Sequence, residues 1–552
     1  METWFVLVSV VVFLLEINVS SAAIRVASGK PAVHEQRKTS NPEENTPEYW
    51  NNVAQAILQK AKAKKPNTNK AKNVILFLGD GMSLPTVTAA RIYEGGESNL
   101  LSFEKFPYTA VSKTYCVDRQ VSESSSTATA YLCGTKANWY TSGVTGAVKM
   151  NDCEASILPE NQVSSIAAWS QLEGKWTGFV TTTRITHASP SALYAHAAHK
   201  DWESDADMVK RKQDPLRCPD IAKQLIDSEV GQNFHVILGC GRNKFLPKEV
   251  TDEEGKSGHR LDKMNLIDEW KTIKEKDMKK YEYVWNRDQL LQVDNDTDYL
   301  LGLFEDDLCK FHVDRDPNMD PTLEEMTKAA IRKLSKSPNG YFLFVEGGMI
   351  DQAHHRSEAG KALVETMEFS KAIRSAVDIT NDKDTLIVVT ADHAHTMSFG
   401  GYPKRGSNVL GLTDFSDVFP INESLPILSY ANGPGYRPEI NGTRHNYTAD
   451  IMDFNYKYPG LFKTFSETHG GDDVLIYAKG PWSHLFEGVM EQNAIPHLMA
   501  YASCVGDKST ACKDDANIKG SGSSVSKSFA VILYFQLVLM IVYVKYFIVI
   551  LY

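Results

Sequence analysis

The sequence predicts an α/β fold with one large, mostly parallel central β-sheet that is covered by helices on both faces. Strand and helix patterns alternate from about residue 73 to about residue 400, which is typical of parallel strands joined by helices. Several strand-like segments are continuous runs of Val, Ile, Leu and Phe bounded by glycine, as in strands buried on both faces. The 552 residues could form three to four domains of ~150 residues each, but we favour one continuous sheet.

The charge and composition indicate a globular protein that does not bind nucleic acid. The formal net charge is -10, and 42% of the residues are hydrophobic. The one marked basic run, Lys60 to Lys72, has no aromatic residues between its lysines. We interpret this run as a solvated helix end and linker.

The first 22 residues fit a secretory signal peptide. An apolar core from Trp4 to Leu15 precedes Ser20-Ser21-Ala22, and cleavage is expected near Ala22. The signal departs from the usual pattern because Glu2 is the only charged residue before the core, where a basic residue is usual.

Residues 516–552 fit a glycosylphosphatidylinositol (GPI) attachment signal. Small residues precede a short polar spacer and an apolar tail from Phe529 to Tyr552. The alternative is an ordinary transmembrane helix, since the tail is about long enough to span a bilayer. Lys545 inside the tail favours the lipid anchor. The chain is therefore expected at the cell surface, on the outer leaflet of the plasma membrane.

The part between these signals, residues 23–515, is expected to form the catalytic domain. An N-terminal arm at about residues 42–65 contains an amphipathic helix from Pro47 to about Ala63, which we expect to pack on a partner. Residues 401–467 interrupt the strand and helix alternation with Gly, Pro and Asn, and we interpret them as an inserted surface subdomain.

Cysteines and glycosylation sequons support an extracellular location. We expect one disulfide between Cys504 and Cys512, which are close in sequence, and a second between Cys153 and Cys218. The sequence leaves the state of four cysteines open: Cys116, Cys133, Cys240 and Cys309. Glycosylation sequons lie at Asn295, Asn422, Asn441 and Asn446.

Four strand-like runs lead to side chains that bind metals. These runs and the residues that follow them are 74–79 with Asp80, 341–345 with Glu346, 385–391 with Asp392 and His393, and 179–183 with His187 and Ser189. Asp351 and His355 share one face of a helix, and His469 precedes another strand. Each of these residues alone could be an ordinary loop or helix residue. Because ligands gather where parallel strands end, their joint occurrence predicts a multi-metal site that cleaves phosphoesters.

Ser124 lies in a run of small residues that opens a helix. Backbone N–H groups at a helix N-terminus can hold an anion, and a metal ion could activate the hydroxyl group. Most serine clusters of this kind are only helix caps or turns. The neighbouring motifs strengthen the interpretation of Ser124 as a nucleophile.

Five segments together resemble the alkaline phosphatase family, in its animal, membrane-anchored and insect-like branch. These segments are residues 73–82, 183–190, 345–355, 390–395 and 467–471. The resemblance extends from the N-terminal arm to Cys512. It implies the alkaline phosphatase fold with a surface "crown" subdomain, and hydrolysis of small phosphate monoesters at alkaline pH through a phosphoserine at Ser124. It also implies a homodimer in which Tyr402 reaches the neighbouring active site.

The resemblance implies four metal ions. It assigns Asp351, His355 and His469 to one zinc ion, and Asp80, Asp392, His393 and Ser124 to a second. It assigns Asp80, Ser189 and Glu346, with His187 nearby, to magnesium. It assigns Glu249, the Phe304 carbonyl, Glu305 and Asp320 to a peripheral calcium ion, although Glu249 lies in a variable stretch. The ligand types agree with the first three sites, since histidine and carboxylate favour zinc and oxygen ligands favour magnesium.

Two residues beside the expected site depart from the family pattern. The family has Asp before its serine and an Arg that forks onto the phosphate, whereas this chain has Glu123 and Lys200. Lysine is a point charge and cannot form the bidentate fork. Ser125 and Ser126 also replace small apolar residues. An alternative hypothesis is therefore a catalytically weakened homologue that acts as a cell-surface binding protein.

Overall fold

The computed structural model describes residues 41–414, 424–439, 441, 445, 447 and 449–506. The two expected processing segments, Asn422, Asn446 and Cys512 lie outside these residues. The described part contains no helix that is long and apolar enough to cross a membrane.

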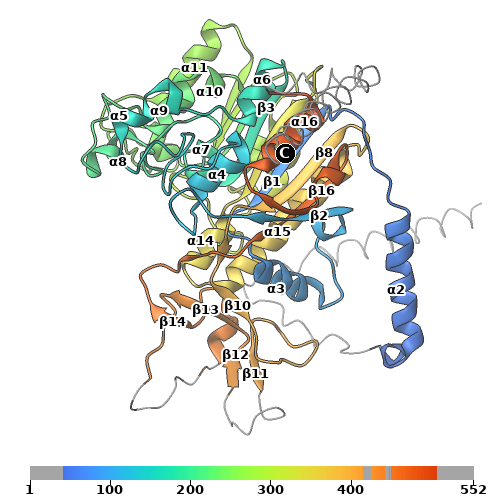
Figure 1. The fold of residues 1–552 in the computed structure, drawn as a ribbon. Helices are drawn as coiled ribbons and strands as arrows, with labels where there is room; N and C mark the ends of the chain where they lie inside the picture. Colours follow the sequence, from blue (N-terminus) through green and yellow to red (C-terminus); the bar gives the residue numbers. More distant parts are fainter. Residues whose placement is uncertain are drawn as a thin grey trace, which may run out of the picture.

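A ten-stranded sheet forms the centre of the molecule, in the order β17-β2-β16-β8-β1-β7-β3-β4-β6-β5 (Figure 1). Strand β16 runs antiparallel to both of its neighbours, and the other adjacent pairs are parallel. The strands are β1 (Asn73–Gly79), β2 (Tyr108–Lys113), β3 (Trp176–Arg184), β4 (Phe234–Cys240), β5 (Tyr281–Val284), β6 (Tyr299–Leu303), β7 (Tyr341–Gly347), β8 (Thr385–Ala391), β16 (Val474–Lys479) and β17 (Gly488–Glu491). The prediction of a large, mostly parallel sheet is confirmed.

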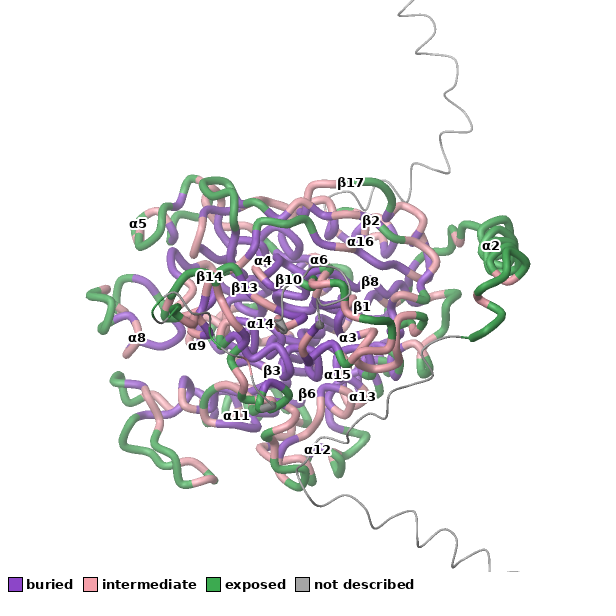
Figure 2. The backbone as a smooth tube through the Cα atoms, turned by 90° about the horizontal axis from the view of Figure 1, so that it is seen from below, coloured by how far each residue is buried: buried purple, intermediate pink, exposed green. Residues whose placement is uncertain are grey.

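Helices cover both faces of this sheet. The α-helices of the described part of the chain, of which α2 lies apart from the sheet, are α2 (Pro47–Lys62), α3 (Leu84–Gly95), α4 (Ser124–Cys133), α5 (Cys153–Ser156), α6 (Ile166–Leu172), α7 (Ala188–Ser191), α8 (Asp205–Lys210), α9 (Ile221–Asp227), α10 (Glu229–Gln232), α11 (Leu266–Lys276), α12 (Arg287–Gln292), α13 (Leu323–Leu334), α14 (Met349–His355), α15 (Ala359–Ile379) and α16 (Ala494–Ser503). Alternate residues of β1 point to opposite faces: Leu76 packs in one core with α4, α6, α9, α11 and α16, and Phe77 packs in another with α3, α13 and α15. Both cores are buried, as Figure 2 shows for the central strands.

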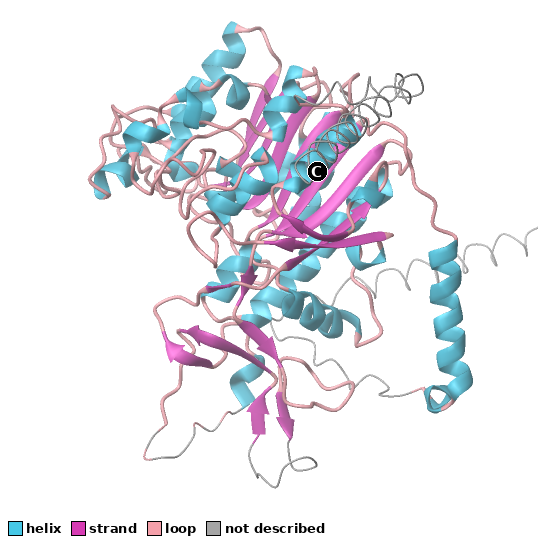
Figure 3. Ribbon diagram, viewed as in Figure 1, coloured by secondary structure: helices cyan, strands magenta, loops and turns pink. Residues whose placement is uncertain are grey.

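The segment expected to form a surface subdomain contributes strands to two small sheets beside the large one (Figure 3). Strands β10 (Met397–Phe399), β13 (Leu428–Gly433) and β14 (Gly460–Lys463) form one sheet, and β11 (Leu412–Asp414) pairs with β12 (Ser424–Pro426). A further short pair, β9 (Ala394–His395) with β15 (His469–Gly470), places His395 opposite His469. This last pair joins the segment after β8 to the segment before β16.

Helix α2 stands away from the rest of the chain (Figures 1 and 2). Thr46 caps the helix and Pro47 occupies its first turn, as expected at a helix start. None of its residues is buried, and Trp50, Val53 and Ile57 are exposed. The apolar face of α2 therefore has no partner within the described part of this chain.

Two disulfides join described residues. The expected bond between Cys153 and Cys218 is present, and Cys240 is bonded to Cys309, a pairing that the sequence left open. Cys504 is disulfide-bonded, but its expected partner Cys512 lies outside the described residues. Two further described cysteines, Cys116 and Cys133, are buried free thiols.

Candidate metal centre

The carboxyl ends of β1, β7 and β8 meet at one edge of the sheet. Gly79 is aligned with Gly347 of β7 and with Ala391 of β8. The strand ends therefore bring Asp80, Glu346 and Asp392 together, and all three side chains are fully buried. The sheet topology thus assembles ligands that lie far apart in the sequence.

Asp351, His355 and His469 converge beside this edge. The Nε2 atoms of both histidines lie 3.4 Å from Oδ1 of Asp351 and 3.2 Å from each other. The Nδ1–H group of His355 donates to the carbonyl of Glu467 at 2.6 Å, and that of His469 donates to the carbonyl of Ser122 at 2.9 Å. These bonds leave both Nε2 atoms free to bind a metal ion.

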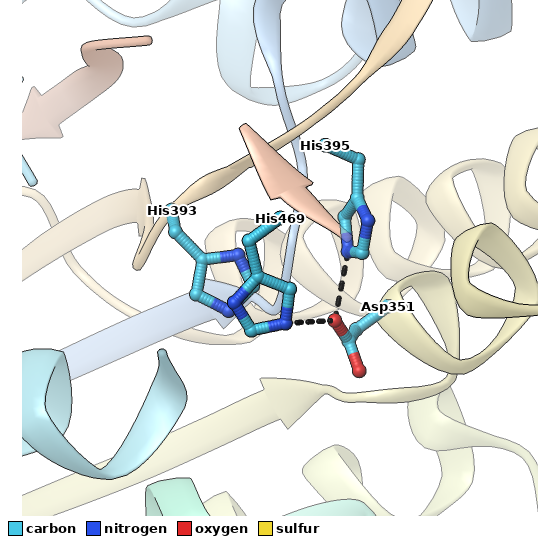
Figure 4. Close-up of side chains that lie close together, drawn as sticks. All are labelled: Asp351, His393, His395 and His469. Atoms are coloured by element: carbon cyan, nitrogen blue, oxygen red, sulfur yellow. Dashed lines mark hydrogen bonds and ion pairs between the residues drawn. The ribbon is translucent and has the colours of Figure 1, made fainter. Parts of the chain in front are cut away.

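Asp80, Asp392 and His393 form a second cluster around Ser124. Nε2 of His393 lies 3.2 Å from Asp392 and 3.4 Å from Asp80. The hydroxyl oxygen of Ser124 lies 3.1 Å from the same Nε2 and donates to Asp80 at 3.4 Å. The ring of His393 stacks on that of His469, with centroids 3.6 Å apart, so the two clusters adjoin (Figure 4).

A third cluster joins Asp80 to Glu346 and His187. The hydroxyl groups of Thr181 and Thr183 donate to Oε2 of Glu346. Four other buried polar atoms of this region have no hydrogen-bond partner: Asp80 Oδ2, Glu346 Oε1, His187 Nδ1 and Ser189 Oγ. Buried polar atoms without protein partners mark a position where an ion or a water molecule can bind, so these donors fit a metal ion.

The buried carboxylates raise one another's pKa values. Burial, followed by the charges of Asp392, Asp351 and Glu346, raises the pKa of Asp80 well above its usual value. Burial raises the pKa of Glu346 to about 7 and that of Asp392 to about 6. So many negative groups in a dry site require cations for charge balance.

His395 and Glu467 belong to the centre, although sequence analysis gave them no role. Nε2–H of His395 donates to Asp351 at 2.7 Å (Figure 4). Its Nδ1–H donates to Glu467 at 2.5 Å. Burial opposes the charge, but Glu467 and Asp351 raise the pKa of His395 to about 10. His395 is therefore an imidazolium that orients the Asp351 carboxylate. The position of His395, two residues after the expected ligand His393, could have indicated this role in the sequence.

Glu123 and Lys200 lie together beside Ser124. Glu123 caps α4, because its carboxylate accepts hydrogen bonds from the backbone N–H groups of Ser125 and Ser126 at 3.2 and 3.0 Å. Nζ of Lys200 lies 3.1 Å from Oε2 of Glu123. Burial opposes the charges, but each partner favours the charged form of the other, so the pKa of Glu123 is lowered and that of Lys200 is raised.

Tyr140 completes this arrangement and was also missed by sequence analysis. The ammonium group of Lys200 lies 4.8 Å from the centroid of its ring, within cation–π range. The backbone of Tyr140 donates to Glu123 at 2.9 Å and accepts from the N–H group of Lys200 at 2.8 Å. Because these contacts need a left-handed backbone at Tyr140 (φ 69°), no simple sequence pattern would have indicated them.

The expected calcium ligands are gathered only in part. Glu305 and Asp320 lie on either side of Lys310, whose ammonium group forms ion pairs with both. The groups of converging ligand side chains found among the described residues do not include Glu249. Burial raises the pKa of Glu305 to about 7, although Lys310 lowers it.

Other expected surface residues are exposed. The side chain of Tyr402, expected to reach a partner, is 72% exposed. Of the four sequon asparagines, Asn295 and Asn441 are described, and both are exposed.

The fold and the clusters of carboxylates and imidazoles define a metal-binding enzyme built on an α/β sheet. The chain matches the alkaline phosphatase family over residues 71–505. It is 45% identical over 509 residues to the membrane-bound alkaline phosphatase of Bombyx mori, which covers 90% of this chain and 91% of that protein. It is 46% identical over 479 residues to the alkaline phosphatase of Gadus morhua, covering 84% of this chain and 98% of that protein.

Solved structures show the same fold. The alkaline phosphatase of Thermus thermophilus has a TM-score of 0.56 and 21% identity, with 80% of this chain and 93% of that chain covered. The alkaline phosphatase of the Antarctic bacterium TAB5 has a TM-score of 0.54 and 20% identity, covering 79% and 98%. The chain belongs to the alkaline phosphatase family, and its activity is that of a phosphomonoesterase.

Proposed function

We propose that this enzyme hydrolyses small phosphate monoesters at alkaline pH through a phosphoserine at Ser124. This proposal rests mainly on the position of Ser124. Ser124 is the first residue of α4, and its hydroxyl oxygen lies 3.1 Å from Nε2 of His393. The hydroxyl group of Ser124 would lose its proton and its oxygen would attack phosphorus while the P–O bond to the leaving group breaks, and the leaving group would take up a proton to depart as the alcohol. Water would then cleave the phosphoserine, which releases inorganic phosphate and restores the serine hydroxyl.

We propose that two zinc ions and one magnesium ion occupy the three clusters. Zinc would be held by Asp351, His355 and His469 and by Asp80, Asp392, His393 and Ser124; magnesium would be held by Asp80, Ser189 and Glu346, with His187 nearby. When bound, such ions supply positive charge that stabilises the oxygens entering and leaving phosphorus. In support, a mutant of the TAB5 enzyme is described with magnesium in its M3 site.

Lys200 would bind the phosphoryl oxygens, and Glu123 would hold it in place. The side chain of Lys200 is 18% exposed, so its ammonium group can reach a ligand while it pairs with the buried Glu123 carboxylate. These groups recognise the phosphate and leave the rest of the substrate unspecified, so we propose broad tolerance among phosphate monoesters.

Steady-state hydrolysis of an aryl phosphate at alkaline pH, with zinc and magnesium present, tests this function. We expect turnover by the native enzyme and its loss in Ser124→Ala, with the fold retained. A native enzyme that binds zinc but does not turn over would instead support the cell-surface binding protein. More than about one per cent residual rate in Ser124→Ala would shift the nucleophile to water or to Ser125 or Ser126.

We also propose that the mature enzyme, after loss of residues 1–22 and 516–552, is GPI-anchored to the outer leaflet of the plasma membrane. The relative from Bombyx mori, named as membrane-bound, supports this proposal. Phosphatidylinositol-specific phospholipase should release the protein from cells. Membrane association that persists after complete treatment would favour a spanning helix.

A homodimer is the proposed assembly. The exposed apolar side chains of α2, at Trp50, Val53 and Ile57, support a partner on this face. Sedimentation at micromolar concentration should show a species of twice the chain mass, and a purely monomeric species would contradict the proposal.

A further inference from the structure

His354 lies on the helix that carries two of the expected zinc ligands, but its ring contacts other partners. Helix α14 contains Asp351, His354 and His355, and the side chain of His354 is fully buried. Its Nε2 atom lies 3.0 Å from the hydroxyl oxygen of Thr86 on α3. Its Nδ1 atom lies 2.8 Å from the hydroxyl oxygen of Tyr430 on β13. Both ring nitrogens are therefore hydrogen-bonded to hydroxyl groups, so the ring is placed for support rather than for metal binding.

These hydrogen bonds form a chain that starts at Tyr430. Tyr430 is buried, and His354 is the partner found for its hydroxyl group among the described residues. A buried hydroxyl with one partner uses its proton by donating it, so Nδ1 of His354 accepts and Nε2–H donates to Thr86. The Thr86 hydroxyl lies 2.8 Å from that of Ser83, which caps the same helix. His354 is thus held in one tautomer and one orientation.

The ring of His354 supports the ring of His395. The two rings are stacked, with centroids 4.7 Å apart and planes 29° apart. The rings of three expected zinc ligands also lie near His395, at centroid distances of 5.1, 5.6 and 5.2 Å: His355, His393 and His469. His395 donates to Asp351 at 2.7 Å (Figure 4). A tilt of His395 would therefore move Asp351, so the position of His354 affects the metal centre.

Tyr430 belongs to the small sheet of the inserted segment. Its strand β13 pairs with β10, and Tyr430 lies opposite Met397, two residues after His395. The N–H group of Ala431 donates to the carbonyl of Thr396 at 3.3 Å. The Tyr430 hydroxyl therefore reaches the metal-ligand helix α14 from a segment, residues 401–467, that supplies none of the expected metal ligands.

We propose that His354 is a positioning residue of the metal centre and that the Tyr430 hydroxyl fixes it. The ring of His354 holds His395 in the orientation that directs the Asp351 carboxylate. The small sheet thereby controls how firmly zinc is held at Asp351. This inference rests on the first of the two proposed zinc ions.

Zinc release from the loaded enzyme to a colorimetric chelator tests this role. Tyr430→Phe removes the hydroxyl group, keeps the ring and should speed release by about three- to tenfold, less than loss of a direct partner of a ligand. His354→Gln removes the ring and should speed release by about tenfold or more. The double variant should release zinc no faster than His354→Gln alone, because Tyr430 acts through His354.

Tyr458→Phe is the matched control. Tyr458 is also a buried tyrosine of the inserted segment, and its hydroxyl oxygen lies 2.7 and 2.9 Å from the carbonyl oxygens of Leu410 and Ile451. Tyr458→Phe should lower the Tm of the zinc-free enzyme at least as much as Tyr430→Phe does, because it also loses a buried hydrogen bond. It should release zinc at the native rate.

Native zinc release in Tyr430→Phe would overturn the inference, and so would equal acceleration in Tyr430→Phe and Tyr458→Phe. A double variant that releases zinc faster than His354→Gln would overturn it as well. The two tyrosine variants decide the matter even if His354→Gln fails to fold. A native enzyme that holds no zinc would overturn the proposed zinc centre and this inference with it, whereas full zinc content with unchanged release overturns this inference alone.

Discussion

The ammonium group of Lys200 lies 3.1 Å from the carboxylate of Glu123, directly beside Ser124. Both residues depart from the family pattern, yet their opposite charges still pair. The Glu123 carboxylate is further fixed by the backbone N–H groups of Ser125, Ser126 and Tyr140. The opposite charges of the pair are therefore preserved. The effect of the altered side-chain geometry on phosphate binding can be tested.

Lys200→Arg should lower KM and tighten inhibition by inorganic phosphate. A guanidinium fork adds one charge-assisted hydrogen bond to phosphate, worth on the order of 1 to 3 kcal/mol. The gain should be partial, because Glu123 is one methylene longer than aspartate. Steady-state kinetics with phosphate as inhibitor measures the effect.

The matching double variant is Lys200→Arg with Glu123→Asp. Its gain should exceed the sum of the two single changes, as expected for a coupled pair. If KM and phosphate inhibition stay unchanged in both singles and in the double variant, the departure has no effect and the weakened-enzyme hypothesis loses its basis.

Removing the ring of Tyr140 should weaken phosphate binding. Its ring lies 4.8 Å from the ammonium group of Lys200, and such a contact contributes about 0.5 to 2 kcal/mol. Glycine tolerates the left-handed backbone here, so Tyr140→Gly removes the ring and leaves the backbone contacts possible. The inhibition constant of phosphate should rise by roughly two- to thirtyfold.

Tyr140→Phe is the control, because it keeps the ring and should keep the native inhibition constant. Equal losses of phosphate binding in Tyr140→Phe and Tyr140→Gly would assign the effect to the hydroxyl group. Unchanged binding in Tyr140→Gly would show that Tyr140 does not position Lys200.

His395→Gln should weaken zinc binding at Asp351. The imidazolium holds the Asp351 carboxylate at 2.7 Å, and loss of such an orienting partner typically costs 10- to 100-fold in metal affinity. Zinc retention during titration with a chelator measures this directly. If His395→Gln retains zinc as well as the native enzyme does, the other neighbours of Asp351 are sufficient to hold its carboxylate in place.

Glu365→Gln should stabilise the enzyme at alkaline pH and have little effect near pH 4. Burial raises the pKa of Glu365 to about 8, whereas the usual value is 4.5. Below pH 4.5 the carboxyl group is protonated in both states. Between pH 4.5 and 8 the unfolded chain loses a proton that the folded chain keeps, so stability falls, and above pH 8 the full cost is present.

Glutamine is neutral at all these pH values. Its side-chain oxygen can still accept the hydrogen bond from the backbone N–H group of His312, which donates to Glu365 at 2.6 Å in the native enzyme. We expect a gain of at least about 1 kcal/mol in the free energy of unfolding at pH 9. Denaturant unfolding at pH 4 and pH 9 measures the difference. A gain of equal size at both values would assign the effect to packing.

Much of the fold was predictable from the sequence because buried parallel strands are continuous apolar runs. The run from Val74 to Gly79 is strand β1 apart from one residue, and Asp80 lies at its end as expected. The carboxylates and histidines could be assigned because each follows such a strand, shares a helix face or, for His469, precedes a strand. Local sequence pattern carries this information.

The contacts that the sequence did not reveal depend on distant backbone geometry. Tyr140 meets Lys200 because of a left-handed backbone, and His395 meets Glu467 through the pairing of β9 with β15. Lys310 meets Glu305 and Asp320 within one long loop held by the bond from Cys309 to Cys240. Loop conformation of this kind has no periodic signature in sequence.

The position of the covalently bound phosphate tests the central claim most directly. The native enzyme, quenched in acid during turnover of a phosphate monoester and digested, should yield a peptide phosphorylated at Ser124 by mass spectrometry. Ser124→Ala should yield none. A phosphate found on Ser125 or Ser126, or active enzyme with no phosphorylated serine, would contradict the account.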